Sequence, residues 1–336
     1  MNILIIGGTG LLGLEAARQL MKRGHEVVGV ALPPLPEGVE VPPGYRLVYG
    51  NYLSMSDKGL LNMMKGMHAL VFAAGIDERV EGPSPIYDLY FKYNVQPVRR
   101  LLRLAVEAKV AHAVILGSYF AYAARKFPKW ELEEHHPYIR SRIEQEKAAL
   151  SFASSGAMNV AVLELPYIFG VQPGRRPVWT ILLEQILAMK KKTYYPKGGT
   201  AMVTVKQVGQ AIVGTIDRNK GGHAYPIGYY NKTWVELLTL FHRHAEIERP
   251  IATVPTWIYQ LGVNRVVKKK AKQGIEMGLN MKKFTPVMTS RLFIDKNEGS
   301  ESLGVQPDDI DQAIAESVQA SLKALQGQAM VGMKAE

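Results

Sequence analysis

Two side chains four residues apart carry the clearest chemical signal in this sequence. Tyr138 and Arg142 lie in the stretch HPYIRSRIEQEK, at what looks like the beginning of a helix. Residues four apart are neighbours on one helical face. A free tyrosine has a pKa of ~10, and a cation one turn away stabilises the phenolate and lowers that pKa. The pair is therefore suited to proton transfer at a carbinol or carbonyl oxygen.

The choice of arginine leaves two interpretations open. Arg142 keeps the positive charge beside Tyr138, but with a pKa above ~12 it cannot deprotonate and pass a proton on, as a lysine would. The site is either a retuned acid/base pair or the remains of one. YAARK, from Tyr122 to Lys126, has the same spacing, but Phe127-Pro128 follows at once and we expect a loop there. His135 and His136 are expected to contact solvent at the helix entry.

A glycine-rich loop near the start of the chain predicts a second function. GGTGLLG places Gly7, Gly10 and Gly13 between an apolar run and a helical pattern. The first glycine permits a tight turn, the second lets the backbone approach a pyrophosphate, and the third allows close helix–strand packing. This context predicts dinucleotide binding.

The second apolar run of the sequence does not reveal which dinucleotide is bound. An acidic residue normally ends the second strand of such a unit and bonds the adenosine ribose. Ala31 and Leu32 stand there instead, and no arginine follows to hold a 2′-phosphate. The sequence therefore predicts NAD(P) and leaves NAD against NADP undecided.

Apolar runs and helical patterns alternate through the first half of the chain, and these elements must position the residues above. Strands are expected at 2–7, 25–32, 45–52, 68–75, 112–118 and 158–166, with helices at about 11–24, 57–66, 86–109 and 138–155. Such alternation indicates a parallel sheet covered on both faces. We therefore expect an α/β protein with a Rossmann-type doubly wound parallel sheet and a smaller C-terminal substrate-binding lobe.

The pattern loosens after Gly170, which suggests how the chain divides. We expect a dinucleotide-binding Rossmann domain over 1–170, to which 200–228 returns, and a substrate-binding lobe or lid from 171–199 and 229–327. Helices are expected at 178–192, 233–244 and 308–325, and a last core strand at 223–228. The Lys-, Met- and Gly-rich region 255–285 has weak periodicity and is interpreted as a lid. Residues 328–336 are expected to form a flexible tail.

Composition narrows the class of protein. With 336 residues and no cysteine, disulfides and thiolate chemistry are excluded, and no metal ligand set is predicted. We expect no signal peptide and no transmembrane segment, which favours a cytoplasmic protein. The net charge of +11 is concentrated in lysine clusters at 190–192, 268–272 and 282–283. We interpret these as solvated surface, with an anionic ligand or weak peripheral membrane contact as alternatives, and no nucleic acid is expected.

Several weak motifs in a fixed order give the chain a family resemblance. The glycine loop, the stretch YGNYLSMSDKGLLNMMKGMHALVFAAG, the helix YNVQPVRRLLRLAVEA, the strand end VILGS and the tyrosine are all present. Together they resemble the extended short-chain dehydrogenase/reductases, the NAD-dependent epimerase/dehydratase family, nearly end to end. The resemblance implies a Rossmann fold, an NAD(P)-dependent oxidoreductase or epimerase activity, and a homodimer formed through the tyrosine-bearing helix.

The resemblance also implies roles for individual residues. Tyr138 would be the general acid/base and Ser118 the hydroxyl that polarises the substrate, with Arg142 standing where the family has lysine. Asn51 replaces the family's adenine-contacting aspartate. The implied cofactor-binding residues are Gly7, Thr9, Gly10, Leu11, Leu12, Gly13, Asn51, Tyr52, Leu53, Ala73, Ala74, Gly75, Asn94 and Pro166.

The substrate class stays open at this level. In LELPYIFG, Glu164 and Tyr167 fall near positions where sugar-nucleotide members of the family carry arginine and asparagine, although Arg175 and Arg176 offer a phosphate grip. The 255–285 region is reminiscent of branches that act on apolar alcohols and ketones, and its residues Trp257, Ile258, Tyr259 and Leu261 suit either an apolar pocket wall or the core of the lobe. A non-catalytic dinucleotide sensor that keeps the fold is the alternative function.

Overall fold

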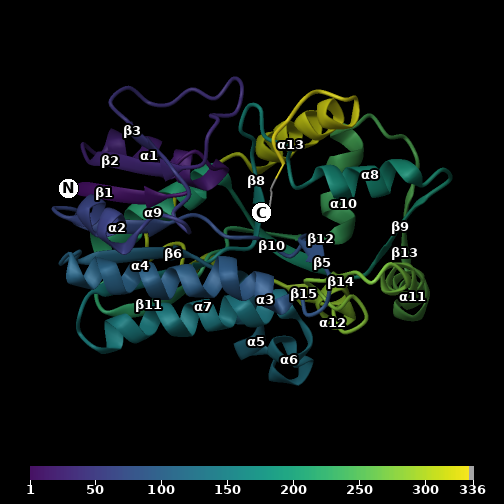
Figure 1. Ribbon diagram of the computed structural model, residues 1–336. Coiled ribbons are helices and arrows are strands. Elements are labelled where there is room, and N and C mark those ends of the chain that lie inside the picture. Colours follow the sequence, from purple (N-terminus) through teal and green to yellow (C-terminus); the bar gives the residue numbers. More distant parts are fainter. Residues whose placement is uncertain (333–336) are drawn as a thin grey trace.

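A seven-stranded parallel sheet forms the centre of the protein (Figure 1). The computed structural model describes residues 1–332. In spatial order the strands are β11 (Gly222–Pro226), β7 (Asn159–Glu164), β6 (His112–Leu116), β4 (Ala69–Phe72), β1 (Asn2–Ile6), β2 (Glu26–Ala31) and β3 (Arg46–Tyr49). All neighbouring pairs run parallel. The order in which successive strands are added reverses between β1 and β4, which confirms the predicted Rossmann-type doubly wound sheet.

Both faces of the sheet are covered by helices, as the apolar strands require. Ile3 and Ile5 of β1 point into one core, and Leu4 and Ile6 into another, because side chains alternate along a strand. The first core is closed by α1 (Leu11–Lys22) and α9 (Val205–Arg218). The second is closed by α2 (Asp57–Met64), α4 (Gln96–Glu107) and α7 (Pro137–Ser154), which lie on the opposite face in Figure 1.

The helix predicted over 86–109 is interrupted. It divides into α3 (Tyr87–Tyr90), a π-helical turn at Phe91–Val95, and α4. A π turn takes in one extra residue and re-aims the side chains around it. Here it places Asn94, which is fully buried, against the end of β4.

The prediction of a loop at YAARK was wrong. These residues belong to α5 (Tyr119–Lys126), whose N-cap is Ser118 and which ends directly before Phe127. The proline does stop the helix, but the Ser118 hydroxyl accepts a hydrogen bond from the Phe120 amide and allows two turns to form before it. A 3₁₀ turn at Pro128–Trp130 and the short α6 (Leu132–His135) then lead into α7.

The second half of the chain adds a smaller mixed sheet. β10 (Gly199–Thr204) pairs with β8 (Tyr167–Phe169), β12 (Tyr230–Thr233) and β15 (Arg291–Leu292). The helices α8 (Thr180–Ala188), α10 (Trp234–His244) and α13 (Ile310–Leu325) pack on one another around an aromatic core. β10 and α9 lie in the segment 200–228. The division into two lobes stays a prediction.

Smaller elements complete the fold. β9 (Thr193–Pro196) pairs with β13 (Ile251–Val254), and β5 (Glu81–Gly82) pairs with β14 (Glu276–Met277). The weakly periodic region 255–285 contains a 17-residue helix, α11 (Thr256–Lys272), and the segment after it includes α12 (Thr285–Thr289) and a 3₁₀ turn at Lys296–Glu298. No helix in the described part of the chain is both long and apolar enough to cross a membrane.

The end of the chain returns to the middle of the molecule. Val331 donates its amide to the Gly174 carbonyl at 2.7 Å, and its own carbonyl accepts the Arg176 amide at 3.0 Å. Of the tail predicted over 328–336, residues 333–336 lie outside the described residues. The last described residues therefore pack on the segment that follows β8.

Candidate active site

The glycine loop is shaped by space that no side chain can enter. Gly7 has a φ of +89°, and a Cβ placed on it would lie 2.5 Å from the Ala73 carbonyl oxygen. A Cβ on Gly13 would lie 2.2 Å from the Gly7 carbonyl oxygen. Gly10, the N-cap of α1, is less enclosed, and the helix has no acidic residue in its first turn. The loop is thus a backbone cradle at a helix N-terminus, which suits a pyrophosphate.

The rest of the predicted cofactor residues follow from this loop toward the ends of β1, β3 and β4. Thr9 is buried, and Leu11 and Leu12 are half-buried at the first turn of α1. Asn51 is exposed, and its side-chain oxygen accepts the Leu53 amide at 3.0 Å, which closes a turn. Arg100 of α4 donates to the carbonyls of Tyr52 and Leu53, both at 3.2 Å. The turn that replaces the family's aspartate is therefore held in place from α4.

The segment after β8 lies against the glycine loop, which the sequence did not reveal. Gln172 donates from its side-chain amide to the Thr9 carbonyl at 2.9 Å and accepts from Arg175 Nε at 3.2 Å. Burial lowers the pKa of Arg175, which is half-buried beside the loop. Of the two predicted phosphate-gripping arginines, Arg175 is the one that the structure brings next to the cradle.

Asn94 fixes the loop after β4. Its side-chain oxygen accepts the Ile76 amide at 2.9 Å, and its amide donates to the Ile76 carbonyl and the Ser141 hydroxyl, both at 3.1 Å. Gly75 has a φ of +117°, and a Cβ placed on it would lie 2.6 Å from the Asn94 side-chain oxygen, so only glycine fits there. Ala73 and Ala74 are half-buried between this clamp and the glycine loop. The buried asparagine is therefore a positioning residue for the strand end.

Tyr138 lies in the first turn of α7, fully enclosed by other side chains. Its ring packs against Tyr90 and Phe120, with centroids 5.6 Å and 6.3 Å away. Burial raises the pKa of the Tyr138 hydroxyl above its ordinary value; nearby Arg142 and the Ser118 hydroxyl oppose that rise. Ser118 is itself buried at the start of α5, just beyond β6. The structure thus brings together the tyrosine that the sequence placed at the beginning of a helix and the serine that it placed at a strand end.

Arg142 is engaged by the backbone. Its Nη2 donates to the Ile76 carbonyl at 3.1 Å, and its Nη1 donates to Leu116 O at 3.3 Å and to the Gln145 side chain at 3.0 Å. The guanidinium carbon lies 5.3 Å from the centre of the Tyr138 ring. Arg142 therefore ties the ends of β4 and β6 to α7 while keeping a positive charge beside the tyrosine.

Glu78 is a titratable group of this site that the sequence reasoning missed. It lies in the loop after β4, half-buried, between Asp77 and Arg79. Burial, and next the Asp77 charge, raise the pKa of Glu78 to about 7, while Arg79 and Arg142 oppose the rise. The Glu78 carboxylate in turn raises the pKa of Tyr138. The available signal was an Asp-Glu-Arg run directly after an apolar strand, where ligands of such folds bind.

The alternative tyrosine pair faces elsewhere. Tyr122 donates to both oxygens of Glu298, at 2.8 and 3.0 Å, and Lys126 contacts the Tyr122 hydroxyl at the surface. Although YAARK is helical, its tyrosine therefore already has a partner far from the glycine loop in sequence and structure.

The histidines before Tyr138 differ from the prediction of solvent contact. His136 is fully buried, and its Nδ1 accepts the Asn280 amide at 3.0 Å; only His135, which pairs with Glu131 at 3.0 Å, is partly open to solvent. Burial lowers the pKa of His136 to about 4. Next to it, the Tyr138 amide donates to the Gly278 carbonyl at 3.0 Å. The beginning of α7 is thus joined to the segment between β14 and α12.

The strand before Gly170 supplies an aromatic lining. Pro166 is buried directly after β7, beside Leu165, whose carbonyl accepts the Tyr119 amide at 3.0 Å. The Tyr167 ring lies 6.1 Å from Tyr119 and 5.7 Å from Trp234, centroid to centroid. Glu164, in contrast, is fully buried and bonds Arg125 of α5 through both oxygens at 2.7 Å. Glu164 is therefore occupied by an internal ion pair.

The predicted apolar wall in α11 is only partly formed. Tyr259 packs against the aromatic core, whereas Trp257, Ile258 and Leu261 are exposed. The reason is the helical period, since residues 257 and 261 share the face opposite to the one that Tyr259 and Val263 bury. These three side chains form neither the pocket wall nor the core of the lobe.

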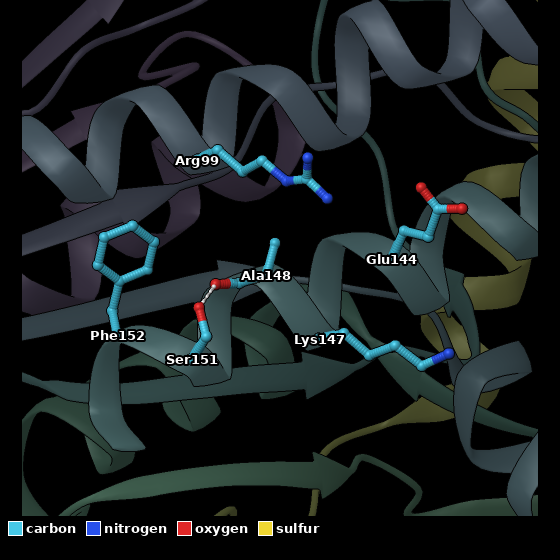
Figure 2. A pocket seen from close by; sticks show the side chains of 6 residues that line it. All are labelled: Arg99, Glu144, Lys147, Ala148, Ser151 and Phe152. Atoms are coloured by element: carbon cyan, nitrogen blue, oxygen red, sulfur yellow. Dashed lines mark hydrogen bonds between the residues drawn. The ribbon is translucent and has the colours of Figure 1, made fainter. Parts of the chain in front are cut away.

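A groove elsewhere on α7 lies outside this constellation. Figure 2 shows it between α4 and α7, with Arg99, Glu144 and Lys147 around it, and with the Ser151 hydroxyl donating to the Ala148 carbonyl at 2.8 Å. Tyr138 and Arg142 occupy a different face of the same helix, turned toward the strand ends. The groove carries charges of both signs and is open to solvent.

Comparison with known proteins identifies the family. The model of the NAD dependent epimerase/dehydratase family matches residues 3–228, and the chain belongs to this family of enzymes. No curated protein matches the sequence at a significant level.

Solved structures agree on the fold. The crystal structure of gox2253 is 20% identical, covers 98% of this chain and 99% of its own, and has a TM-score of 0.75. The UDP-glucuronic acid 4-epimerase from Bacillus cereus, in complex with UDP-glucuronic acid and NAD, is 12% identical, with coverages of 96% and 100% and a TM-score of 0.70. The UDP-glucose 4-epimerase from Bifidobacterium longum, in complex with NAD⁺ and UDP, is 14% identical, with coverages of 98% and 100% and a TM-score of 0.68. At these identities the likeness concerns the fold.

Proposed function

We propose that the protein is an NAD(P)-dependent oxidoreductase or epimerase that acts at a secondary alcohol or ketone, with Tyr138 as its general acid/base. The observation that carries the proposal is the meeting of Ser118 and Tyr138 beyond the carboxyl end of β6, in a chain whose β1–α1 loop is an open backbone cradle. Ligands of doubly wound sheets bind at this edge, next to the strand-order switch.

The chain's own residues suit a dinucleotide. The space that a Cβ would fill at Gly7 and Gly13 is taken by backbone, so the loop fits the close approach of a pyrophosphate. Arg175 is connected to the Thr9 carbonyl through the side chain of Gln172 and would complement the negative charge of the phosphates. Asn51 to Leu53 would receive the adenosine, and Ala73 to Gly75 with Pro166 would border the nicotinamide. When bound, NAD(P) supplies or accepts the hydride.

The proton chemistry belongs to two hydroxyls. The Ser118 hydroxyl would hold the substrate oxygen, and the Tyr138 hydroxyl would donate a proton to it or remove one. Tyr138 needs help as a base because burial raises its pKa, and the charge of Arg142 gives that help without a transferable proton. Glu78, whose pKa is near neutrality, would adjust the field at the tyrosine.

An apolar alcohol or ketone is the substrate class that these side chains favour. Tyr119, which follows Ser118, packs with Tyr167 and Trp234 in an aromatic cluster, and β7 carries no lysine or arginine that could meet a diphosphate. A nucleotide sugar is the alternative class, supported by the names of the solved relatives and by Arg175 near the cradle. A panel of both classes, with NAD and NADP compared directly, separates the two.

The test is turnover in matched variants. Tyr138→Phe should lower kcat by about 10²–10⁴-fold and leave dinucleotide binding within about twofold, because the ring remains and the proton carrier is lost. Tyr122→Phe, in the alternative pair, is the control and should keep its activity. Equal loss in both variants, or none in Tyr138→Phe, would remove Tyr138 from the mechanism.

One observation favours a second function, that of a dinucleotide sensor without turnover. Arg142 binds two main-chain carbonyls and a glutamine, and these contacts hold the strand ends whether or not a substrate is present. Under this alternative the protein binds NAD(P), no substrate of either class turns over, and Tyr138→Phe changes nothing but stability. Isothermal titration of the dinucleotide, paired with the substrate panel, distinguishes the sensor from the enzyme.

A homodimer through α7 remains part of the proposal. The outer faces of α4 and α7 would form the contact, and this is the surface that bears the groove in Figure 2. Arg99→Glu and Lys147→Glu place opposite charges there. Light scattering at several concentrations should give twice the mass of one chain for the natural sequence and a lower mass for the double variant; a single-chain mass for both would exclude the dimer.

A further inference from the structure

Helix α11 exposes large apolar side chains to water. Trp257 retains 64% of its surface and Leu261 retains 54%, while Ile258 and Val266 are also exposed. Only Val263 is buried, and Tyr259 packs inward on the aromatic core. Single exposed hydrophobic residues are ordinary, but Trp257 and Leu261 share one face of the helix with Ile258 beside them, and such a group marks a binding surface. Val266 lies on the opposite side of the helix.

The same face of α11 becomes strongly basic toward its end. At 3.6 residues per turn, Lys268 and Lys272 fall on the side of the helix that carries Trp257 and Leu261. The helix has no acidic residue, and in the described part of the chain Lys270, which contacts Glu81, is its one ion-paired lysine. An apolar first half is thus followed by a basic second half on one outward face.

Neighbouring elements extend this surface. α11 follows β13 directly, and β13 pairs with β9, where Tyr194 retains 51% of its surface. Before β9 lie the exposed Lys190, Lys191 and Lys192, and before them Leu187 of α8 is exposed as well. In Figure 1 these elements follow one another down the right-hand edge of the molecule, from α8 through β9 and β13 to α11. Exposed aromatic and aliphatic side chains and lysines therefore occur together along one edge of the protein.

The combination of apolar and basic side chains along this edge fits a lipid surface better than a second copy of the chain or a nucleic acid. An interfacial helix places tryptophan and leucine at the boundary of the headgroups and lysines on the lipid phosphates. A second copy of the chain fits less well, because a symmetric contact would bring lysines against lysines. A nucleic acid would meet the lysines but leave Leu261, Ile258 and Val266 without apolar partners.

We propose that α11, with the lysines at 190–192, docks the protein onto an anionic lipid surface. Trp257, Ile258 and Leu261 enter the headgroup region, and Lys268, Lys269 and Lys272 contact lipid phosphates. This proposal is independent of the chemistry at Tyr138, since it concerns the outer face of the helix.

The experiment is co-sedimentation of the full chain with vesicles. Vesicles of phosphatidylcholine with about one third phosphatidylglycerol should pellet the protein, and vesicles of phosphatidylcholine alone should not, with binding weakened at high salt. Trp179 and Trp234 are buried and Trp130 is half-buried, so a blue shift of tryptophan emission on binding is assigned to Trp257 by its loss in Trp257→Ser. Lys268→Glu with Lys272→Glu, and separately Trp257→Ser with Leu261→Ser, should each lower the partition coefficient about tenfold or more.

A matched pair of substitutions separates local docking from net charge. Lys22→Glu with Lys58→Glu makes the same change of charge at two exposed lysines on α1 and α2 and should keep binding within about twofold. All variants change exposed side chains, and thermal unfolding verifies that each is folded. Equal pelleting with both vesicle types, or equal loss in the control pair, would overturn the proposal. Self-association that Trp257→Ser and Leu261→Ser abolish, without vesicle binding, would also overturn it.

Discussion

The glycine loop and the beginning of α7 use the backbone in opposite ways. At Gly7 and Gly13 side chains are absent because main-chain atoms of Ala73 and Gly7 occupy the space that a Cβ would need. At α7 a long side chain, Arg142, reaches two main-chain carbonyls and occupies them. In the loop, backbone packs directly on backbone, whereas at α7 a side chain reaches across to the backbone of other segments.

This difference explains why the glycine spacing alone predicts a local structure, whereas the Tyr138–Arg142 spacing does not. The spacing of the glycines can be interpreted from the loop itself. At each glycine, a side chain would collide with an atom of the same loop or of the adjacent strand end. The role of a cation four residues after Tyr138 depends on which hydrogen-bond acceptors lie at the ends of β4 and β6. A Lys-to-Arg change in such a place is a change of contacts as well as of pKa.

The largest effect is expected at the glycine loop. In Gly13→Ala the new methyl group meets the Gly7 carbonyl oxygen at 2.2 Å, so the loop must shift. We expect a loss of about 4 kcal/mol in the free energy of unfolding and at least tenfold weaker dinucleotide binding. Denaturant unfolding and calorimetry measure the two. Gly262→Ala, also within a helix but with open space around it, should instead gain up to about 1 kcal/mol. A neutral Gly13→Ala would refute the steric account of the cradle.

Arg142 tests the other half of the comparison. Arg142→Met keeps an unbranched apolar stem but removes the guanidinium and leaves the carbonyls of Ile76 and Leu116 without their donor, which should cost about 3 kcal/mol of stability. Arg142→Lys keeps the charge and should lose less. Arg140→Met, an exposed position on the same helix, should stay within about 0.5 kcal/mol. If Arg142→Met proves as stable as Arg140→Met, the clamp has no structural role.

His136 gives the helix start a pH dependence. The ring must be neutral for Nδ1 to accept the Asn280 amide, and burial lowers its pKa to about 4. Its contribution is therefore present above pH ~6.5 and is lost as the pH falls toward 4, by about 2–3 kcal/mol in total. His136→Asn offers an amide oxygen as a non-titrating acceptor and should flatten the unfolding free energy over that interval. Unchanged slopes in both proteins would contradict this.

The smallest effect is expected at Glu78. Its carboxylate raises the pKa of Tyr138, so Glu78→Gln should lower the tyrosine's pKa. The basic limb of the pH profile of kcat/KM should move down by less than about one unit, and any acidic limb near pH 7 should disappear. Asp88→Asn, an exposed carboxylate of α3, is the control and should leave both limbs in place. A profile that is identical in the two variants would exclude an influence of Glu78 on the proton transfer.

The sequence predicted those parts whose cause is local. The order of strands and helices, the sheet type and the β1–α1 loop follow from apolar periodicity and glycine spacing, which need no knowledge of distant residues. α5 was missed because a proline two residues after a helix end was given more weight than a serine N-cap eight residues earlier. The π turn around Asn94 was missed because the extra residue leaves the apolar period of the helix almost unchanged.

The parts that could not be predicted depend on contacts between distant segments. Glu78 was missed, and Arg175 could not be distinguished from Arg176, because the importance of both residues arises from which strand ends and loops meet, not from their neighbours in the chain. The two faces of α11 were obscured by its weak periodicity, which comes from having apolar residues both inward and outward. Such a pattern has no single hydrophobic stripe. The irregularity arises because α11 has apolar residues on the proposed lipid-binding face as well as on the buried face.

The junction between α7 and the segment 278–280 has a consequence for engineering. Two main-chain groups of that segment, Gly278 O and Asn280 N, complete the hydrogen bonding of Tyr138 and His136. The C-terminal part of another member of the family cannot simply be exchanged for that of this protein, because it must bring an equivalent carbonyl and amide to the same two residues. The helix that carries the tyrosine therefore cannot be separated from the segment 278–280 when parts of the protein are exchanged.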